Sequence, residues 1–249
     1  MIKIRLKFTK HGPIKYLGHL DVMRYFQKAI RRAHLDVKYS EGYHPHQLLG
    51  FAQPLGVGIT SDGEYLDMTL NTLPEDGLQG VMHSLNDVMQ EGICVTKIME
   101  LTDAKDKAMT QVAAAAYTVM FRDGHAPAPG WEEALVEYCS QDAINIMKRS
   151  KKGEKETDIK PFIHEVLIMD ETICLILTAG NEGGLRPELL LHAFMRSLGM
   201  EPTPASLIVH RLDTYQEGVD EEGRYLEPLI PDGSKFYREE PLILYSKGS

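Results

Sequence analysis

The sequence predicts an α+β fold made of two ferredoxin-like halves with antiparallel sheets, followed by an extended C-terminal arm. Strand-like and helix-like segments first follow the order β-α-β-β-α-β, and the later part of the chain loosely repeats that order. At 249 residues and 43% apolar content, the chain can bury one large core or two smaller ones. We therefore expect one half at 1–101, a second at 113–214, and an extension at 215–249.

The first half carries the clearer patterns. Apolar residues alternate with cations over residues 3–9, which is the period of a half-buried strand. Residues 19–33 place apolar side chains on one helical face. The tripeptide Ser61-Asp62-Gly63 is typical of a hairpin turn. The other predicted elements are a short strand at 35–39, strands at 48–60 and 64–70, a helix at 74–90 and a closing strand at 93–100.

The second half begins after a charged, alanine-rich link at 102–112. A helix is expected over 187–198, where Pro187 occupies the first turn and Gly199 ends the helix. From Glu217 onward the chain is polar and contains prolines, and its segment PLILY is expected to pack back as an extended arm. The remaining elements are a strand at 113–121, a helix at 131–139, strands at 144–149 and 165–178 around a basic loop, and a final strand at 206–214.

The charges are distributed unevenly along the chain. The net charge is −9, but residues 1–50 hold ten Lys and Arg against three Asp and Glu, while the remaining residues hold 17 against 33. Such an asymmetry indicates a basic surface for a polyanion at the N-terminal end. The alternative is that these cations only form the solvated faces of one strand and one helix.

Membrane and secretion signals are absent from the sequence pattern. No apolar run reaches the ~20 residues that a membrane span needs, and the N-terminus has no signal-peptide core. The three cysteines lie 45 and 35 residues apart, which matches no metal or redox motif and suits a reducing compartment. We expect a cytoplasmic protein with no membrane partner, no cofactor and no metal.

The segment Tyr39–Asp67, YSEGYHPHQLLGFAQPLGVGITSDGEYLD, is unusually rich in polar rings and in Gly and Pro. Pro45 favours an extended backbone at His44, so His44 and His46 should share a face next to Tyr43.

We expect these rings to form a polar rim together with residues near the start of the first helix. The free N–H groups at a helix start attract anions. This rim is either a phosphate- or RNA-contacting edge or a polar turn whose histidines bond to backbone. A metal held by His44 and His46, with His19 or His11, is a third alternative. The rim residues are Lys10, His11, Lys15, His19, Tyr43, His44 and His46.

Two later segments are further candidates for anion binding. Residues 148–162 carry six cations against three acids and could wrap a polyanion as a loop, or form a solvated hairpin. The glycine-rich stretch 179–190 leads into a helix with Arg186 at its first turn, but it lacks the P-loop and dinucleotide-binding patterns. A plain loop between strand and helix is the alternative for that stretch.

Three motifs in order resemble a bacterial family of unknown function. They are FTKHGPIKYLGHLDVMRYFQKAIRRA at 8–33, the segment Tyr39–Asp67, and KKGEKETDIKPFI at 151–163. Members of that family are usually encoded beside, or fused to, a radical-SAM protein, often near genes for RNA processing. The resemblance implies a radical-SAM partner. The chain itself has no Cx3Cx2C motif and cannot hold the radical-SAM cluster alone.

Three functions follow, in order of preference. The first is a non-catalytic RNA- or ribonucleoprotein-binding accessory module that works with a radical-SAM protein. The second is an RNA-processing or RNA-modifying enzyme with His19, His44 or His46 as general acid or base. The third is a protein-interaction adaptor whose acidic later segment is the docking face. The substrate and the oligomeric state stay open. The residues expected to bind RNA or another anion are Lys15, His19, Arg24, Tyr43, His44, His46, Lys151, Lys152, Lys155, Lys160 and Arg186.

Overall fold

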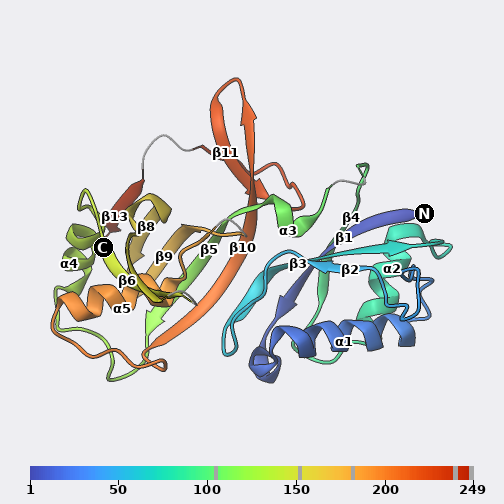
Figure 1. Ribbon diagram of the computed structural model, residues 1–249, viewed down its shortest axis with the longest axis horizontal. Coiled ribbons are helices and arrows are strands. Elements are labelled where there is room, and N and C mark those ends of the chain that lie inside the picture. The colour runs from blue at the N-terminus through green and yellow to red at the C-terminus, as the bar shows by residue number, and fades with distance from the viewer. Residues whose placement is uncertain (104–105, 151–152, 181–182, 238–240, 247–249) are drawn as a thin grey trace.

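A large, mostly antiparallel sheet runs through both halves of the molecule and carries few helices. The computed structural model describes residues 1–103, 106–150, 153–180, 183–237 and 241–246. Within these ranges, eleven strands join in one sheet and two more form a separate hairpin. Figure 1 shows α1 (His19–Arg32) and α2 (Gly77–Asn86) on the first half, and α4 (Trp131–Cys139) and α5 (Pro187–Ser197) on the second.

The first half has the strand order β2-β3-β1-β4, and each neighbouring pair is antiparallel. Helix α1 packs its apolar face on this sheet, where the ring of Phe26 lies 4.7 Å from that of Phe8. The strands are β1 (Ile2–Lys10), β2 (Leu49–Phe51), β3 (Thr60–Leu70) and β4 (Val95–Glu100), with a 3-10 turn, η1 (Gly12–Tyr16), before α1.

Three predictions for the first half were wrong. Residues 35–39 form no strand; Val37 and Tyr39 make only isolated bridges. The strand expected at 48–60 is reduced to β2, because the Pro- and Gly-containing stretch after Phe51 leaves the sheet. Ser61-Asp62-Gly63 is not a hairpin turn. It lies inside β3, where Ser61 pairs with a strand from the second half.

The second half has the strand order β8-β9-β5-β10, again antiparallel between neighbours. The single strand expected at 165–178 is two strands, because the chain turns between them at Asp170, which has a φ of 53°. The elements are α3 (Ala108–Gln111), β5 (Val112–Phe121), β6 (Asn145–Ser150), β7 (Gly153–Asp158), η2 (Lys160–Phe162), β8 (Ile163–Met169), β9 (Thr172–Thr178) and β10 (Leu207–Asp220). Strands β6 and β7 form the separate hairpin.

Strand β10 joins the two halves. It runs antiparallel to β5 and parallel to β3, pairing His210 with Thr60 and Arg211 with Ser61. Asp213 adds side-chain contacts across the junction: it accepts hydrogen bonds from Lys7 Nζ at 2.5 Å and Tyr65 Oη at 2.7 Å. The two halves therefore share one continuous sheet.

The C-terminal segment packs back on the fold, as expected for PLILY. Strand β10 continues past the predicted end at residue 214 and pairs with β11 (Gly223–Pro228), which pairs in turn with β12 (Phe236–Tyr237). Strand β13 (Leu242–Ser246) then lies parallel to β8 and covers that edge of the sheet. No helix in the described ranges is long and apolar enough to cross a membrane.

The cysteines should differ sharply in reactivity. Burial raises the pKa of the Cys139 thiol to about 12, whereas Cys94 is exposed. Because the thiolate is the reactive form, iodoacetamide at neutral pH should label Cys94 in the native protein and Cys139 only after unfolding. Peptide mass spectrometry of timed samples measures this. Equal labelling rates for the two thiols in the native protein would contradict the buried position of Cys139.

Candidate nucleic-acid interface

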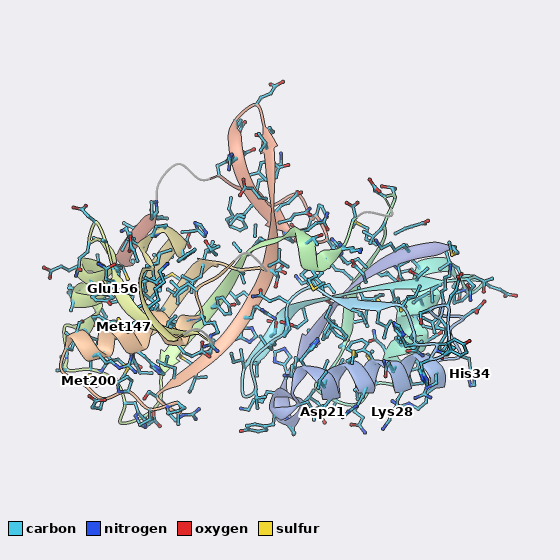
Figure 2. All side chains as sticks on the ribbon, viewed as in Figure 1. Asp21, Lys28, His34, Met147, Glu156 and Met200 are labelled. Atoms are coloured by element: carbon cyan, nitrogen blue, oxygen red, sulfur yellow. The ribbon has the colours of Figure 1, made fainter. Side chains whose placement is uncertain are left out.

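The outer side of α1 is basic. The period that buries Val22, Phe26 and Ile30 leaves the opposite side to polar residues. Figure 2 shows Asp21, Lys28 and His34 along this outer side, away from the sheet. We define the basic helix face as Arg24, Lys28, Arg31 and Arg32, all exposed.

The basic helix face keeps most of its charge available. Arg24 pairs with Asp21 at 3.3 Å, and both side chains are exposed, so the pair is weak. Arg31 and Arg32 donate to the carbonyls of Gln27 and Val88, which leaves their positive charges unneutralised. Among the residues that the structure describes, Arg24 is the one member of this face that has an ion pair.

A loop at residues 39–47 rests against the middle of α1. Gln47 Nε2 donates to the carbonyl of Gln27 at 3.4 Å, and a Ser40–His46 contact closes the base of the loop. Tyr43 is 101% exposed, and His44 is exposed beside it. The ring of His46 bonds to Ser40 Oγ at 2.8 Å through Nδ1. His46 thus fits the polar-turn interpretation, whereas Tyr43 and His44 are presented to solvent.

Lys15 and His19 are less available than the sequence suggested. The ammonium of Lys15 lies 5.2 Å from the ring centroid of Tyr16. The ring of His19 stands edge-on against Phe51, with centroids 5.3 Å apart. Gly18 is the N-cap of α1. His19 packs on aromatic carbon at the start of that helix and is half-buried.

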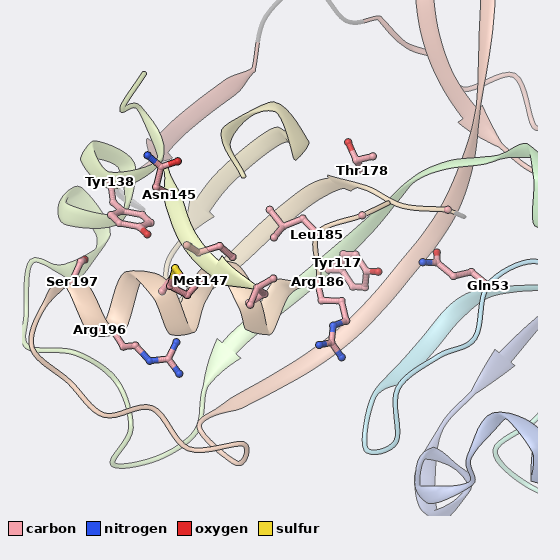
Figure 3. Close-up of a pocket in the computed structure, with 15 residues that line it drawn as sticks. Gln53, Tyr117, Tyr138, Asn145, Met147, Thr178, Leu185, Arg186, Arg196 and Ser197 are labelled. Carbon is pink, nitrogen blue, oxygen red and sulfur yellow. The ribbon is translucent and has the colours of Figure 1, made fainter. Parts of the chain in front are cut away.

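A groove of about 920 Å³ runs between β6 and α5 in the second half and ends against Gln53 of the first half (Figure 3). We call it the α5 groove. Among the residues that the structure describes, its lining holds two arginines and no acidic residue. Arg186 precedes α5 and Arg196 lies near its end, so their Cα atoms are ~15 Å apart at 1.5 Å per residue. The other lining residues are Tyr117, Tyr138, Asn145, Ile146, Met147, Thr178, Gly180, Gly184, Leu185, Leu189, Ala193 and Ser197.

A buried arginine fixes one end of the α5 groove. Arg211, 2% exposed, donates to Glu64 through Nε at 2.8 Å and Nη2 at 2.6 Å. It also donates to the carbonyl of Gln53 at 3.2 Å and to the phenol oxygen of Tyr117. Burial raises the pKa of Tyr117, which keeps its hydroxyl protonated. Because Gln53 and Tyr117 both line the groove, Arg211 positions that end.

Lys10 is a second buried cation at this junction. Its ammonium donates to the carbonyl of Leu17 at 2.8 Å, and burial lowers its pKa although Glu64 nearby opposes that shift. Lys10 and Arg211 thus lie near one carboxylate, that of Glu64. Lys10 is one of the predicted rim residues, whereas neither Arg211 nor Glu64 was predicted from the sequence.

Two histidines share one carboxylate where β1 ends and β10 meets β3. His11 Nε2 lies 2.6 Å from Asp62 Oδ1, and His210 Nε2 lies 3.1 Å from Asp62 Oδ2. The two imidazole rings are stacked with centroids 5.7 Å apart, and Thr60 Oγ1 bonds to Nδ1 of His210 at 2.8 Å. No local pattern links residues this far apart in sequence, and of the two histidines only His11 is among the predicted rim residues.

The predicted anion-binding residues fall into two groups. Lys15, His19, Arg24, Tyr43, His44 and His46 belong to the first half. In the second half, Arg186 lines the α5 groove, Lys155 is exposed on β7, and Lys160 donates to the carbonyl of Cys139 at 2.5 Å. Lys151 and Lys152 lie outside the described residues. No three His, Cys, Asp or Glu side chains in the described ranges are arranged to hold a metal ion.

A family model described as "Uncharacterized protein conserved in bacteria (DUF2344)" matches residues 3–187. The chain belongs to this family. The DUF2344 match covers all three motifs on which the resemblance to a bacterial family of unknown function rests. The association with a radical-SAM protein rests on that resemblance alone.

The DUF2344 protein also resembles a solved structure entitled "Crystal Structure of a Cbf5-Nop10-Gar1 Complex", at 12% identity and a TM-score of 0.42. The match covers 85% of this chain and 48% of the other, so the DUF2344 protein spans about half the length of that chain. A likeness this low carries no inference about function. The comparison with curated proteins gave no match.

Proposed function

We propose that this DUF2344 protein is an RNA- or ribonucleoprotein-binding accessory module that works with a partner radical-SAM protein. The observation that carries the proposal is the basic helix face next to the exposed Tyr43. Arginine and lysine side chains bind phosphates by charge, and an exposed aromatic ring stacks on an unpaired base. The basic helix face combines with Tyr43 to offer both kinds of contact on adjoining elements.

The proposed architecture is a tandem of ferredoxin-like halves, at 1–101 and 113–214, with a C-terminal extension at 215–249. It is supported by the matching strand orders β4-β1-β3-β2 and β10-β5-β9-β8 and by two helices in each half. In this scheme the β6–β7 hairpin is an insertion in the second half. Ferredoxin-like units recur among RNA-binding proteins, an analogy of fold that adds to the site argument without replacing it.

Neutralising the basic helix face should weaken RNA binding for every sequence. In Lys28→Gln/Arg31→Gln we expect the slope of log affinity against log salt to flatten by about 1.4, or ~0.7 for each lost contact to single-stranded phosphate. Tyr43→Ala should lower affinity by ~1–3 kcal/mol without changing that slope, because stacking involves no charge. Fluorescence anisotropy with labelled RNA over a salt series measures both quantities.

The matched control is Arg224→Gln, which removes an exposed cation that pairs with Glu217 at 3.0 Å on the β10–β11 hairpin. It should bind RNA like the wild type. Wild-type protein that binds no RNA even at low salt would refute the RNA proposal and leave the protein-interaction adaptor.

A second candidate function, an RNA-processing enzyme, is favoured by the His11–Asp62–His210 arrangement. A carboxylate that orients an imidazole is the usual pairing in general acid–base catalysis. His19, His44 and His46, the histidines first considered for this role, have no such partner among the described residues. RNA cleavage that is abolished in His210→Gln, with RNA binding intact, would favour the enzyme. Binding without cleavage by the wild type favours the accessory module.

A further inference from the structure

We propose that the α5 groove binds a segment of single-stranded RNA and makes the protein selective for single strands. This inference rests on the proposed RNA-binding function and adds a second site, in the other half of the molecule. The cations of the basic helix face can bind the phosphates of any RNA, whether single- or double-stranded. The α5 groove has the features needed to contact unpaired bases.

The charges of the groove suit an extended polyanion. Neither Arg186 nor Arg196 has an ion pair in the part of the chain that the structure describes, and both are exposed. Their separation of ~15 Å along α5 is too large for one phosphate group to contact both. Figure 3 shows both guanidinium groups on the same side of the groove. A strand that runs along α5 would therefore place phosphates near each arginine.

The walls between the two arginines suit the faces of bases. Met147 is 60% exposed on β6, and the ring of Tyr138 packs against Phe194 with centroids 5.6 Å apart. Leu189 and Ala193 of α5 provide a further apolar surface. Unpaired bases stack on such aromatic and apolar side chains, whereas the bases of a duplex are already stacked on one another.

The amide groups at the groove suit the edges of bases. Arg211 donates to Gln53 Oε1 at 3.5 Å and to the Gln53 carbonyl at 3.2 Å, which fixes the amide and leaves its Nε2 as a donor. Asn145 of β6 adds a second amide. The volume of about 920 Å³ is that of a small-molecule site, too small to admit a duplex. The groove should therefore select single strands, because it is too small for a duplex and because its amides can bond to the edges of unpaired bases.

Competition between single- and double-stranded RNA tests the proposal. Arg186→Gln/Arg196→Gln should lower affinity for single-stranded RNA about tenfold or more and leave duplex affinity unchanged. Lys28→Gln/Arg31→Gln should instead weaken both. The matched control is Lys97→Gln/Arg224→Gln, which removes two exposed, ion-paired cations elsewhere. Circular dichroism of each double variant confirms folding, since none of these side chains is buried.

Photo-crosslinking locates the strand independently of affinity. Single-stranded RNA containing 4-thiouridine should crosslink to peptides carrying Tyr138 or Met147, and excess unlabelled strand should prevent this. Crosslinks in the groove together with unchanged binding by Lys28→Gln/Arg31→Gln would support the groove and refute the helix-face site. Equal losses for single strands and duplexes in Arg186→Gln/Arg196→Gln would overturn the groove proposal. If AMP alone displaces the crosslinked strand as strongly as unlabelled RNA does, the ligand is a free nucleotide and the strand proposal fails.

Discussion

Gly63→Ala is expected to separate β10 from β3 and to destabilise the protein by about 3 kcal/mol or more. A Cβ at this position would lie 2.3 Å from the Cα of Asp213 and 2.7 Å from the carbonyl oxygen of Leu212. Both are backbone atoms, so no side-chain rotation relieves the contact. The strand that joins the two halves must move as a whole. Urea unfolding followed by circular dichroism measures the loss.

Gly50→Ala is the matched control for this change. Gly50 also lies in a strand, but a Cβ there would meet nothing within 4 Å. Its substitution should change the free energy of unfolding by no more than about 1 kcal/mol. Similar losses for the two variants would show that the close approach of Gly63 to β10 does not determine stability.

Glu64→Gln is expected to cost about 3–5 kcal/mol, because it leaves the buried guanidinium of Arg211 without its carboxylate. The two hydrogen bonds of 2.8 and 2.6 Å lose their charge, while Lys10 nearby remains a second cation. The α5 groove should be affected as well, since Arg211 also holds Gln53 and Tyr117. Thermal and urea unfolding measure the loss of stability.

Two further variants show whether the loss of stability comes from the buried Glu64–Arg211 pair or from any change of charge. Glu217→Gln breaks an exposed pair of similar length, 3.0 Å to Arg224, and should cost at most about 1 kcal/mol. The double variant Glu64→Leu/Arg211→Met removes both buried charges and should recover part of the stability. A double variant that is less stable than Glu64→Gln would mean that Arg211 stabilises the fold without its partner.

Elements specified by local patterns could be predicted from the sequence. Helix α4 begins and ends where predicted, and α5 begins at Pro187, because caps and apolar spacing lie within each segment. Ser61-Asp62-Gly63 was misjudged because turn-forming residues usually end strands. Here Gly63 allows the close approach of β10, a strand 150 residues away, and no local stretch of sequence contains both segments.

The residues of the candidate site likewise divide into those that local patterns predict and those that depend on contacts between distant parts of the sequence. Arg24 of the basic helix face and Arg186 were predicted, because clustered charge and helix starts are visible locally, whereas Lys28, Arg31 and Arg32 were not among the predicted site residues. The Glu64–Arg211 pair could not, since its members are 147 residues apart and each resembles an ordinary charged residue in a strand. The Ser40 contact that occupies the ring of His46 also depends on how the loop folds, which the spacing around Pro45 does not specify.

The position of β10 sets an order for folding during synthesis. The first half has all its strands once residue 100 has left the ribosome, and can fold while the rest is being made. The second half begins at β5 but cannot complete its sheet until β10, at residues 207–220, emerges. Until then β5 and the free side of β3 are exposed strand edges, the type of surface on which nascent chains associate. The synthesis of residues 121–220 is therefore the period when this protein most needs a chaperone.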